Sequence, residues 1–202
     1  LNLDGISTTD GLESLALVWG ELSIRDTDLV HVDGLGQLSA VSGDLNLEDN
    51  DDLRNLDGLA SLESVGGNFV LLRHATLDDV DGLSSLRTVG GTFSIQYADT
   101  LETLVGAMPV LESVGYFLLE YNDALTSLGD LPTLTTAEAG LAVVGHPNLM
   151  DIDGLFSLTT VGDDLTMSLH PSLCETDPPD FLEHLTEVGS RPASHYFFEN
   201  TG

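Results

Sequence analysis

Apolar residues recur along this chain with a period of about 24 residues. One column of leucines advances in steps of 24, and a second column, mostly valine, runs beside it in steps of 23 to 25. The two columns are Leu29, Leu53, Leu77, Leu101, Leu125, Leu149 and Leu173, and Val18, Val41, Val65, Val89, Val114, Ala137 and Val161. Self-similarity at a fixed period of this length predicts a repeat architecture, in which stacked units bury one continuous core.

Each unit also carries a shorter alternation. Apolar and polar residues alternate with a period of two in GDLNL at 43–47, GNFVL at 67–71 and GTFSI at 91–95, which predicts short strands with alternate side chains inside. The recurring D-G-L sequence and the glycines after L-x-x-V supply the turns. We therefore expect an all-β solenoid, a parallel β-helix of about eight rungs stacked about 4.8 Å apart.

Both ends of the chain depart from the repeat. We expect a single domain over residues 1–202, with a shortened first rung at 1–20, regular rungs over 20–173 and a C-terminal cap over 174–202. Within the cap, PPDFLEHLTEVG at 178–189 begins with prolines and places Phe181, Leu182 and Leu185 at helical spacing. The cap is therefore expected to contain a short helix, followed by a last strand at 194–198, because an open solenoid end exposes core and unpaired strand edges.

The composition changes the picture mainly through charge. The chain has 34 acidic residues against 5 basic ones, for a formal net charge of −29, yet 42% of its residues are hydrophobic, which argues for a folded core. The five arginines are scattered singly, whereas a phosphate backbone is bound by clustered basic residues. No apolar run reaches the 18 residues of a membrane span. We expect no nucleic-acid partner and no direct membrane insertion.

The repeated D-G-L sequence places aspartates at equivalent corners, and these are Asp10, Asp33, Asp57, Asp81 and Asp153. Two on adjacent rungs, such as Asp57 and Asp81, would stand about 5 Å apart, the separation found in a retaining glycosidase. A catalytic pair is expected to be unique, however, whereas a repeated aspartate before glycine is typical of a turn that bonds its own backbone. The turn interpretation is favoured.

Three histidines share one column, and His146 and His170 lie on neighbouring rungs while His74 stands alone. Two histidines about 5 Å apart could begin a metal site, but no third ligand is evident, so a hydrogen-bonding role toward the loop backbone is favoured. The acidic loops offer hard oxygen ligands at Asp49, Asp51, Asp52, Asp78, Asp79, Asp99 and Asp123. They lack the spacing of a dedicated calcium loop. We expect no cofactor and no metal site, only weak association of calcium with the surface.

The side chains expected on the outside of the strands differ between rungs. They are polar in the first and last rungs, but in the middle rungs they form an apolar stripe bordered by tyrosines. An apolar stripe on so acidic a protein indicates a binding face, although strand-forming residues covered by a neighbouring loop or domain would give the same pattern. The candidate binding residues are Val70, Leu72, Tyr97, Tyr116, Leu118, Tyr121 and Val144.

The pattern G-x-L-x-I-x-x-N-x-x-L-x-x-(L/V)-D-G-L-x-x-L-x-x-V-G-G resembles the receptor L-domain family over roughly residues 6–200. Asn50 and Asn122 match the family's asparagine position, while His74, Ala98, His146 and His170 depart from it. The resemblance implies a right-handed, leucine-rich-repeat-like β-helix of the bacterial or microbial cell-surface type, in an extracellular setting, with ligand contact through a sheet face.

The resemblance also bears on the single cysteine. The segment H-P-S-L-C ending at Cys174 resembles the family's N-P-x-L-C stretch, whose cysteine has a partner further along the chain. We therefore expect the partner of Cys174 beyond Gly202 and the sequence to be part of a longer chain.

Taken together, the sequence favours a non-enzymatic extracellular recognition or adhesion module that binds a protein or glycan at the cell surface through one sheet face. One alternative is a structural surface-layer or fibre component. A less favoured alternative is a β-helix polysaccharide lyase or hydrolase. The chain has no lysine to abstract a proton, and the outward carboxylates Glu48 and Glu120 are expected about 14 Å apart, too far for a glycosidase pair.

Overall fold

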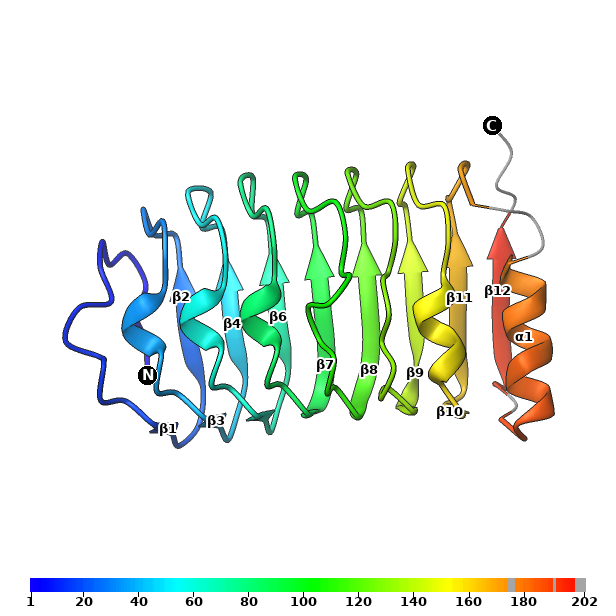
Figure 1. Cartoon of the computed structure of the whole chain (residues 1–202), viewed down its shortest axis with the longest axis horizontal. Coiled ribbons are helices and arrows are strands. Elements are labelled where there is room, and N and C mark those ends of the chain that lie inside the picture. Colours follow the sequence, from blue (N-terminus) through cyan, green and yellow to red (C-terminus); the bar gives the residue numbers. More distant parts are fainter. Residues whose placement is uncertain (174–176, 191, 199–202) are drawn as a thin grey trace.

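The computed structural model describes residues 1–173, 177–190 and 192–198, and these form a stack of parallel strands (Figure 1). The β-solenoid expected from the 24-residue period is confirmed, as are the short helix and the last strand near the C-terminus. Cys174 lies outside the described residues, so its pairing stays a prediction.

The long side of the stack consists of parallel strands that follow one another rung by rung. They are β2 (Leu22–Arg25), β4 (Leu45–Glu48), β6 (Phe69–Leu72), β7 (Thr88–Gln96), β8 (Ser113–Glu120), β9 (Thr136–Val144), β11 (Asp164–Ser168) and β12 (Ser194–Phe198). The repeat sets the register, because Leu45 pairs with Leu22 on one side and with Phe69 on the other. Equivalent positions of the sequence therefore form straight columns along the stack.

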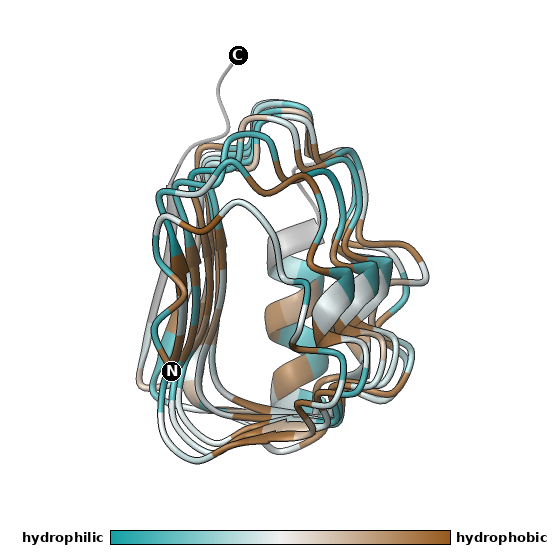
Figure 2. Cartoon of the chain, turned by 90° about the vertical axis from the view of Figure 1, so that its left-hand side faces the viewer, coloured by the Kyte–Doolittle hydropathy of each residue, from teal (hydrophilic) through white to brown (hydrophobic). Residues whose placement is uncertain are grey.

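A shorter side meets the long one at a corner. It is made of β1 (Leu17–Val18), β3 (Ala40–Val41), β5 (Ser64–Val65), β10 (Thr160–Val161) and the first residues of β7, β8 and β9. In the three middle rungs the strand continues through the corner, with a shift of register between Val89 and Thr92. Viewed along the stack, the rungs follow nearly the same outline around a shared interior (Figure 2).

The D-G-L sequences form the turns opposite the long strands, as predicted. Four of the five fold as short 3-10 helices, η1 (Asp33–Leu35), η2 (Asp57–Leu59), η3 (Asp81–Leu83) and η4 (Asp153–Ser157), whereas the first, at Asp10, is a simple turn in the irregular N-terminal segment. The glycine is required by close approach between rungs, because a Cβ atom at Gly58 would collide with the carbonyl oxygen of Val32 in the rung before. The aspartate column is therefore part of the repeat's turn geometry, and this structural role explains its recurrence.

The core is a set of apolar columns. Phe69, Phe93 and Phe117 stack face to face with ring centroids 5.3 and 5.6 Å apart, and the leucine column from Leu29 to Leu173 is almost completely buried. Burial of each such side chain contributes roughly 1.5–3 kcal/mol, so the columns account for most of the stabilisation.

The number of rungs is smaller than the sequence suggested. The stack has about six turns instead of the eight expected. Seven long strands, from β2 to β11, are connected by repeat turns, whereas β12 is reached through a helix. At the other end, residues 1–16 follow an irregular path and join β2 through a bridge between Asn2 and Ser23. Counting both ends as rungs caused the error, because the end segments have strand-like residues without the full turn.

These end segments cover the core. At the N-terminus, Leu3, Ile6, Leu12 and Leu15 pack against the first rungs. At the C-terminus, helix α1 (Asp177–Glu187) lies across the last turn, where Phe181 meets Phe156 edge to face with centroids 5.6 Å apart. Among the described residues, no helix has the length and apolarity required to cross a membrane.

Candidate functional site

The residue that follows the outward bend of each rung points inward and forms the inner polar column. Its members are Thr27, Asn50, His74, Ala98, Asn122, His146 and His170, all buried. Asn122 shows the pattern: its Oδ1 accepts the backbone N–H of Ala98 at 2.9 Å, and its Nδ2 donates to the carbonyl of Ile95 at 3.0 Å. Asn50 bonds Thr27 and Ile24 in the same way. The asparagines thus satisfy buried backbone groups of the rung before.

The histidines occupy the same position and form similar bonds. The Nδ1 atom of His146 accepts the backbone N–H of Asn122 at 3.1 Å, and that of His170 accepts the N–H of His146 at 3.3 Å. The Nε2 atom of His170 donates to the carbonyl of Val143 at 2.8 Å. The two rings stack with centroids 5.4 Å apart and are completely buried.

This environment favours neutral imidazoles. Burial, together with the neighbouring His170, lowers the pKa of His146 to about 4, and burial also lowers the pKa values of His74 and His170. The Nε2 atom of His146 is buried without a hydrogen-bond partner. Within the described ranges, no group of three or more His, Cys, Asp or Glu side chains is placed to hold a metal ion. The structure supports the hydrogen-bonding role for this column.

The acidic loops proposed for weak calcium association are partly engaged by the protein itself. Arg73 forms a two-pronged contact with Asp49, with Nη2 to Oδ2 at 2.6 Å and Nε to Oδ1. That contact lowers the pKa of Asp49. Asp79 accepts the backbone N–H of Asp81 at 3.2 Å, and burial raises the pKa of its carboxyl. Calcium association at the other carboxylates stays a prediction.

The apolar residues predicted on the outward face lie together on neighbouring strands of the long side. Val70, Leu72, Leu118 and Val144 come from β6, β8 and β9 and are half-buried. Residues 94 and 142 complete the patch between them, with Ser94 opposite Val70 and Leu118. The flat, parallel packing of neighbouring side chains accounts for the partial burial, so the face is continuous but shallow.

Tyr116 lies on the same face but is held by a contact that the sequence did not reveal. Its hydroxyl donates to Oδ2 of Asp164 at 2.6 Å, across the intervening rung, where Gly140 has no side chain to block the ring. Burial and the Asp164 carboxylate raise the pKa of the Tyr116 phenol well above its usual range. The ring is therefore fixed along the sheet. The pairing was detectable in principle, since the column reads Tyr116, Gly140, Asp164.

Tyr97 and Tyr121 occupy a different position, at the bend directly after the long strand. We call this column the outer ladder; its members are Asp26, Asp49, Arg73, Tyr97, Tyr121, Gly145 and Leu169. Every member has a left-handed backbone conformation, with φ between 51° and 73°. The two tyrosine rings stack with centroids 5.3 Å apart and are 43% and 38% exposed, and the ring of Tyr121 covers Gly145, where a Cβ would press into it.

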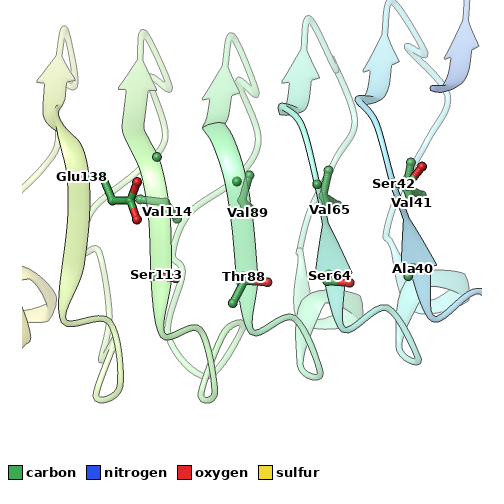
Figure 3. A pocket seen from close by; sticks show the side chains of 13 residues that line it. Ala40, Val41, Ser42, Ser64, Val65, Thr88, Val89, Ser113, Val114 and Glu138 are labelled. Atoms are coloured by element: carbon green, nitrogen blue, oxygen red, sulfur yellow. The ribbon is translucent and has the colours of Figure 1, made fainter. Parts of the chain in front are cut away.

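A groove follows the corner between the short and long sides (Figure 3). This open groove of about 400 Å³ runs across successive rungs. Small side chains such as Ser64, Thr88 and Ser113 line it along one side, Gly66 contributes backbone, and Glu138 stands at one end. The sequence showed the glycines as turn residues but did not indicate a groove, because its depth depends on the angle between the two sides.

Comparisons with known proteins do not assign the chain. No family model matches it, and neither the curated proteins nor the solved structures gave a match.

Proposed function

We propose that this chain is a non-enzymatic recognition module that binds a protein or glycan partner at the cell surface, as its resemblance to receptor L domains implies. The face proposed for binding runs over the middle rungs and ends at the two exposed tyrosines. It comprises Val70, Leu72, Tyr97, Tyr116, Leu118, Tyr121 and Val144. In this proposal the domain is extracellular and requires no cofactor.

The observation that carries the proposal is the presence of tyrosine in the outer ladder. A left-handed conformation costs an L-residue roughly 1–2 kcal/mol unless the residue is glycine, asparagine or aspartate. Three rungs use such residues, namely Asp26, Asp49 and Gly145. Arg73 and Leu169 share the strained conformation with the tyrosines, but Tyr97 and Tyr121 also stack on each other and present exposed aromatic rings. Strain that the fold does not require, on side chains with large contact surfaces, supports a functional role.

The carboxylates of the long side bear on the choice between binding and catalysis. Among the outward carboxylates of the long side, Glu48 is paired with Arg25 at 3.0 Å, so its charge is partly satisfied within the fold. Glu120 lies three rungs from it. This arrangement favours binding over glycoside hydrolysis, which requires two carboxyl groups on opposite sides of one bond.

The test is a screen against glycan and protein arrays with millimolar calcium present. Two variants, Tyr97→Asn/Tyr121→Asn and Tyr116→Ser/Leu118→Ser, are each expected to weaken binding of any partner found by about tenfold or more, because they remove contact surface. Asparagine tolerates the left-handed conformation, so the first variant keeps the backbone. Asp26→Asn is the matched control, at the same ladder position three rungs away.

Either of two results would overturn the proposal. One is normal partner binding by both folded variants. The other is the absence of any partner together with self-association into ordered fibres or layers, which would favour the structural alternative.

A further inference from the structure

A hollow of about 450 Å³ lies beside Tyr97 on the outer edge of the stack. Its lining comes from three successive rungs and consists of Asp51, Arg73, His74, Ala75, Tyr97 and Asp99. Residues 51, 75, 99 and 123 are equivalent positions of four rungs, and this column reads Asp, Ala, Asp, Asp. Ala75 therefore leaves a gap between two carboxylates whose Cα atoms stand two rungs, about 10 Å, apart. We call this gap the Ala75 slot.

The charges around the slot do not balance. Arg73, the cation in the lining, is already bound by Asp49 through both arms of its guanidinium group. The side chains of Asp51 and Asp99, in contrast, take part in no ion pair or hydrogen bond with the described part of the chain. His74 beneath them is buried, and burial lowers its pKa, which keeps it neutral. Arg73 and its partner Asp49 neutralise each other, so Asp51 and Asp99 leave the slot with two uncompensated negative charges.

The slot combines these carboxylates with an aromatic surface. Tyr97 is 43% exposed and is held by stacking on Tyr121, so its ring is positioned before any ligand arrives. A cation over the face of an aromatic ring gains roughly 0.5–2 kcal/mol, and carboxylates add charge-assisted hydrogen bonds. Aspartate, aspartate and tyrosine around a space floored by a methyl group make a site complementary to one guanidinium or ammonium group.

We propose that the Ala75 slot binds a single cationic side chain, arginine or lysine, of a protein partner. This inference rests on the proposed function, because Tyr97 belongs both to the slot and to the face proposed above for binding, here called the recognition face. The net charge of −29 supports it, since the field of the whole chain attracts a basic segment and accelerates its association. Of the two partner classes, protein and glycan, the slot favours protein.

The first experiment uses a probe with one positive charge. N-acetylarginine amide and its uncharged analogue N-acetylcitrulline amide are titrated into the protein at about 0.15 M ionic strength, where exposed charges are largely screened, and binding is followed by NMR. We expect saturable shifts at Ala75, Asp51, Asp99 and the Tyr97 ring with the arginine probe only. The variant Asp51→Asn/Asp99→Asn should weaken its binding by about tenfold.

The control is Asp28→Asn/Asp130→Asn, which removes the same charge from exposed aspartates outside the slot. If the control weakens the probe equally, binding reflects the overall field and the proposal is wrong. Equal binding of the citrulline probe, or of a neutral oligosaccharide, at the slot would also overturn it, because charge would then not be what is recognised.

A second experiment needs no ligand. Ala75→Lys places an ammonium group within the slot, and we expect it to melt at a higher temperature than Ala75→Gln, with the difference lost in the Asp51→Asn/Asp99→Asn background. No difference between the lysine and glutamine variants would contradict the proposal.

These results separate the slot from the recognition face. If Tyr116→Ser/Leu118→Ser abolishes partner binding while the arginine probe still binds, the slot and the face are both supported. If partner binding depends on Tyr116 and Leu118 but not on Asp51 and Asp99, the slot proposal is wrong while the proposed function stands. If partner binding is unaffected by either change, the proposed function fails, whatever the probe does.

Discussion

Each residue of the inner polar column directly follows a residue of the outer ladder in the sequence, yet the two columns differ in the residue types that they accept. Asn122 and Tyr121 are neighbours, as are His146 and Gly145, and the same pairing recurs in every rung. Inside, most residues are ones that can bond the backbone of the preceding rung. Outside, aspartate, arginine, tyrosine, glycine and leucine all occur on one backbone conformation.

The difference indicates which residues the fold selects. In all rungs but that of Ala98, the inner position carries a polar side chain, which suits it to bond buried N–H and C=O groups whose loss is costly. At Ala98 the N–H of His74 in the rung before bonds the carbonyl of Tyr97 instead. The outer position must only accept a positive φ, which asparagine, aspartate or glycine would do with less strain. Folding therefore does not fix the residue type in the outer ladder, and this is why the proposed binding face includes Tyr97 and Tyr121.

The largest effect is expected from breaking the inner column. Replacing Asn122 with leucine leaves the N–H of Ala98 buried without its partner and removes the hydrogen bond that Asn122 donates to the buried carbonyl of Ile95. At about 1–3 kcal/mol for each group, the change should lower the free energy of unfolding by about 4 kcal/mol. Urea denaturation would measure this. A loss below about 1 kcal/mol would show that the column is not a structural requirement.

A somewhat smaller effect should come from acid. The unfolded chain takes up a proton on His146 near pH 6.5, whereas the pKa of the folded side chain is about 4, so stability falls as the pH drops from 6.5 toward 4. The contribution of His146 is on the order of 3 kcal/mol across that range. His146→Asn, which restores the residue of the neighbouring rung, should flatten the pH dependence of the unfolding free energy.

His74→Asn is the comparison for this experiment. Both ring nitrogens of His74 face carbonyl oxygens, of Asn50 and Leu47, which can accept from a protonated ring. Nδ1 of His146 also lies 3.3 Å from a carbonyl oxygen, that of Asn122, but it accepts the N–H of Asn122 as well, and besides burial the neighbouring His170 opposes its protonation. The His74 variant should therefore change the pH profile less, and an equal or greater change would contradict this distinction.

The smallest effect is expected in the outer ladder. Tyr97→Asn/Tyr121→Asn removes the ring stack but relieves backbone strain, so the two contributions oppose each other. We expect the free energy of unfolding to change by less than about 1 kcal/mol in either direction. A loss as large as that of the inner column would show that the tyrosines serve the fold and would remove the main support for a binding role.

Much of the architecture followed from the sequence because it depends on period. The leucine column, the D-G-L turns, the strand positions and the helix near Phe181 were all predictable, since equivalent residues face equivalent neighbours. The number of turns was not, because strand-like residues at the two ends do not complete a full rung.

The site was less predictable, because it depends on relations between rungs. The alternation of residues placed Val70 and Leu118 on the outside, but not the bond from Tyr116 to Asp164, which needs Gly140 between them. Asp26, Asp49 and Gly145 are residue types that adopt a left-handed conformation readily, so they indicated the outer ladder in three rungs. Tyr97 and Tyr121 gave no such indication, because tyrosine rarely adopts this conformation. The Ala75 slot required knowing that residues 51, 75 and 99 are stacked neighbours.

The regular register also governs how this molecule could change length over evolutionary time. Each rung packs against the rung before and the rung after, and the repeat restores the same backbone position after about 24 residues. Duplicating or deleting one whole unit within the stack therefore keeps every inward column continuous and leaves both end caps on compatible neighbours. An unequal exchange between repeats in the gene would then lengthen or shorten the exposed face by one unit, with no compensating change in the interior.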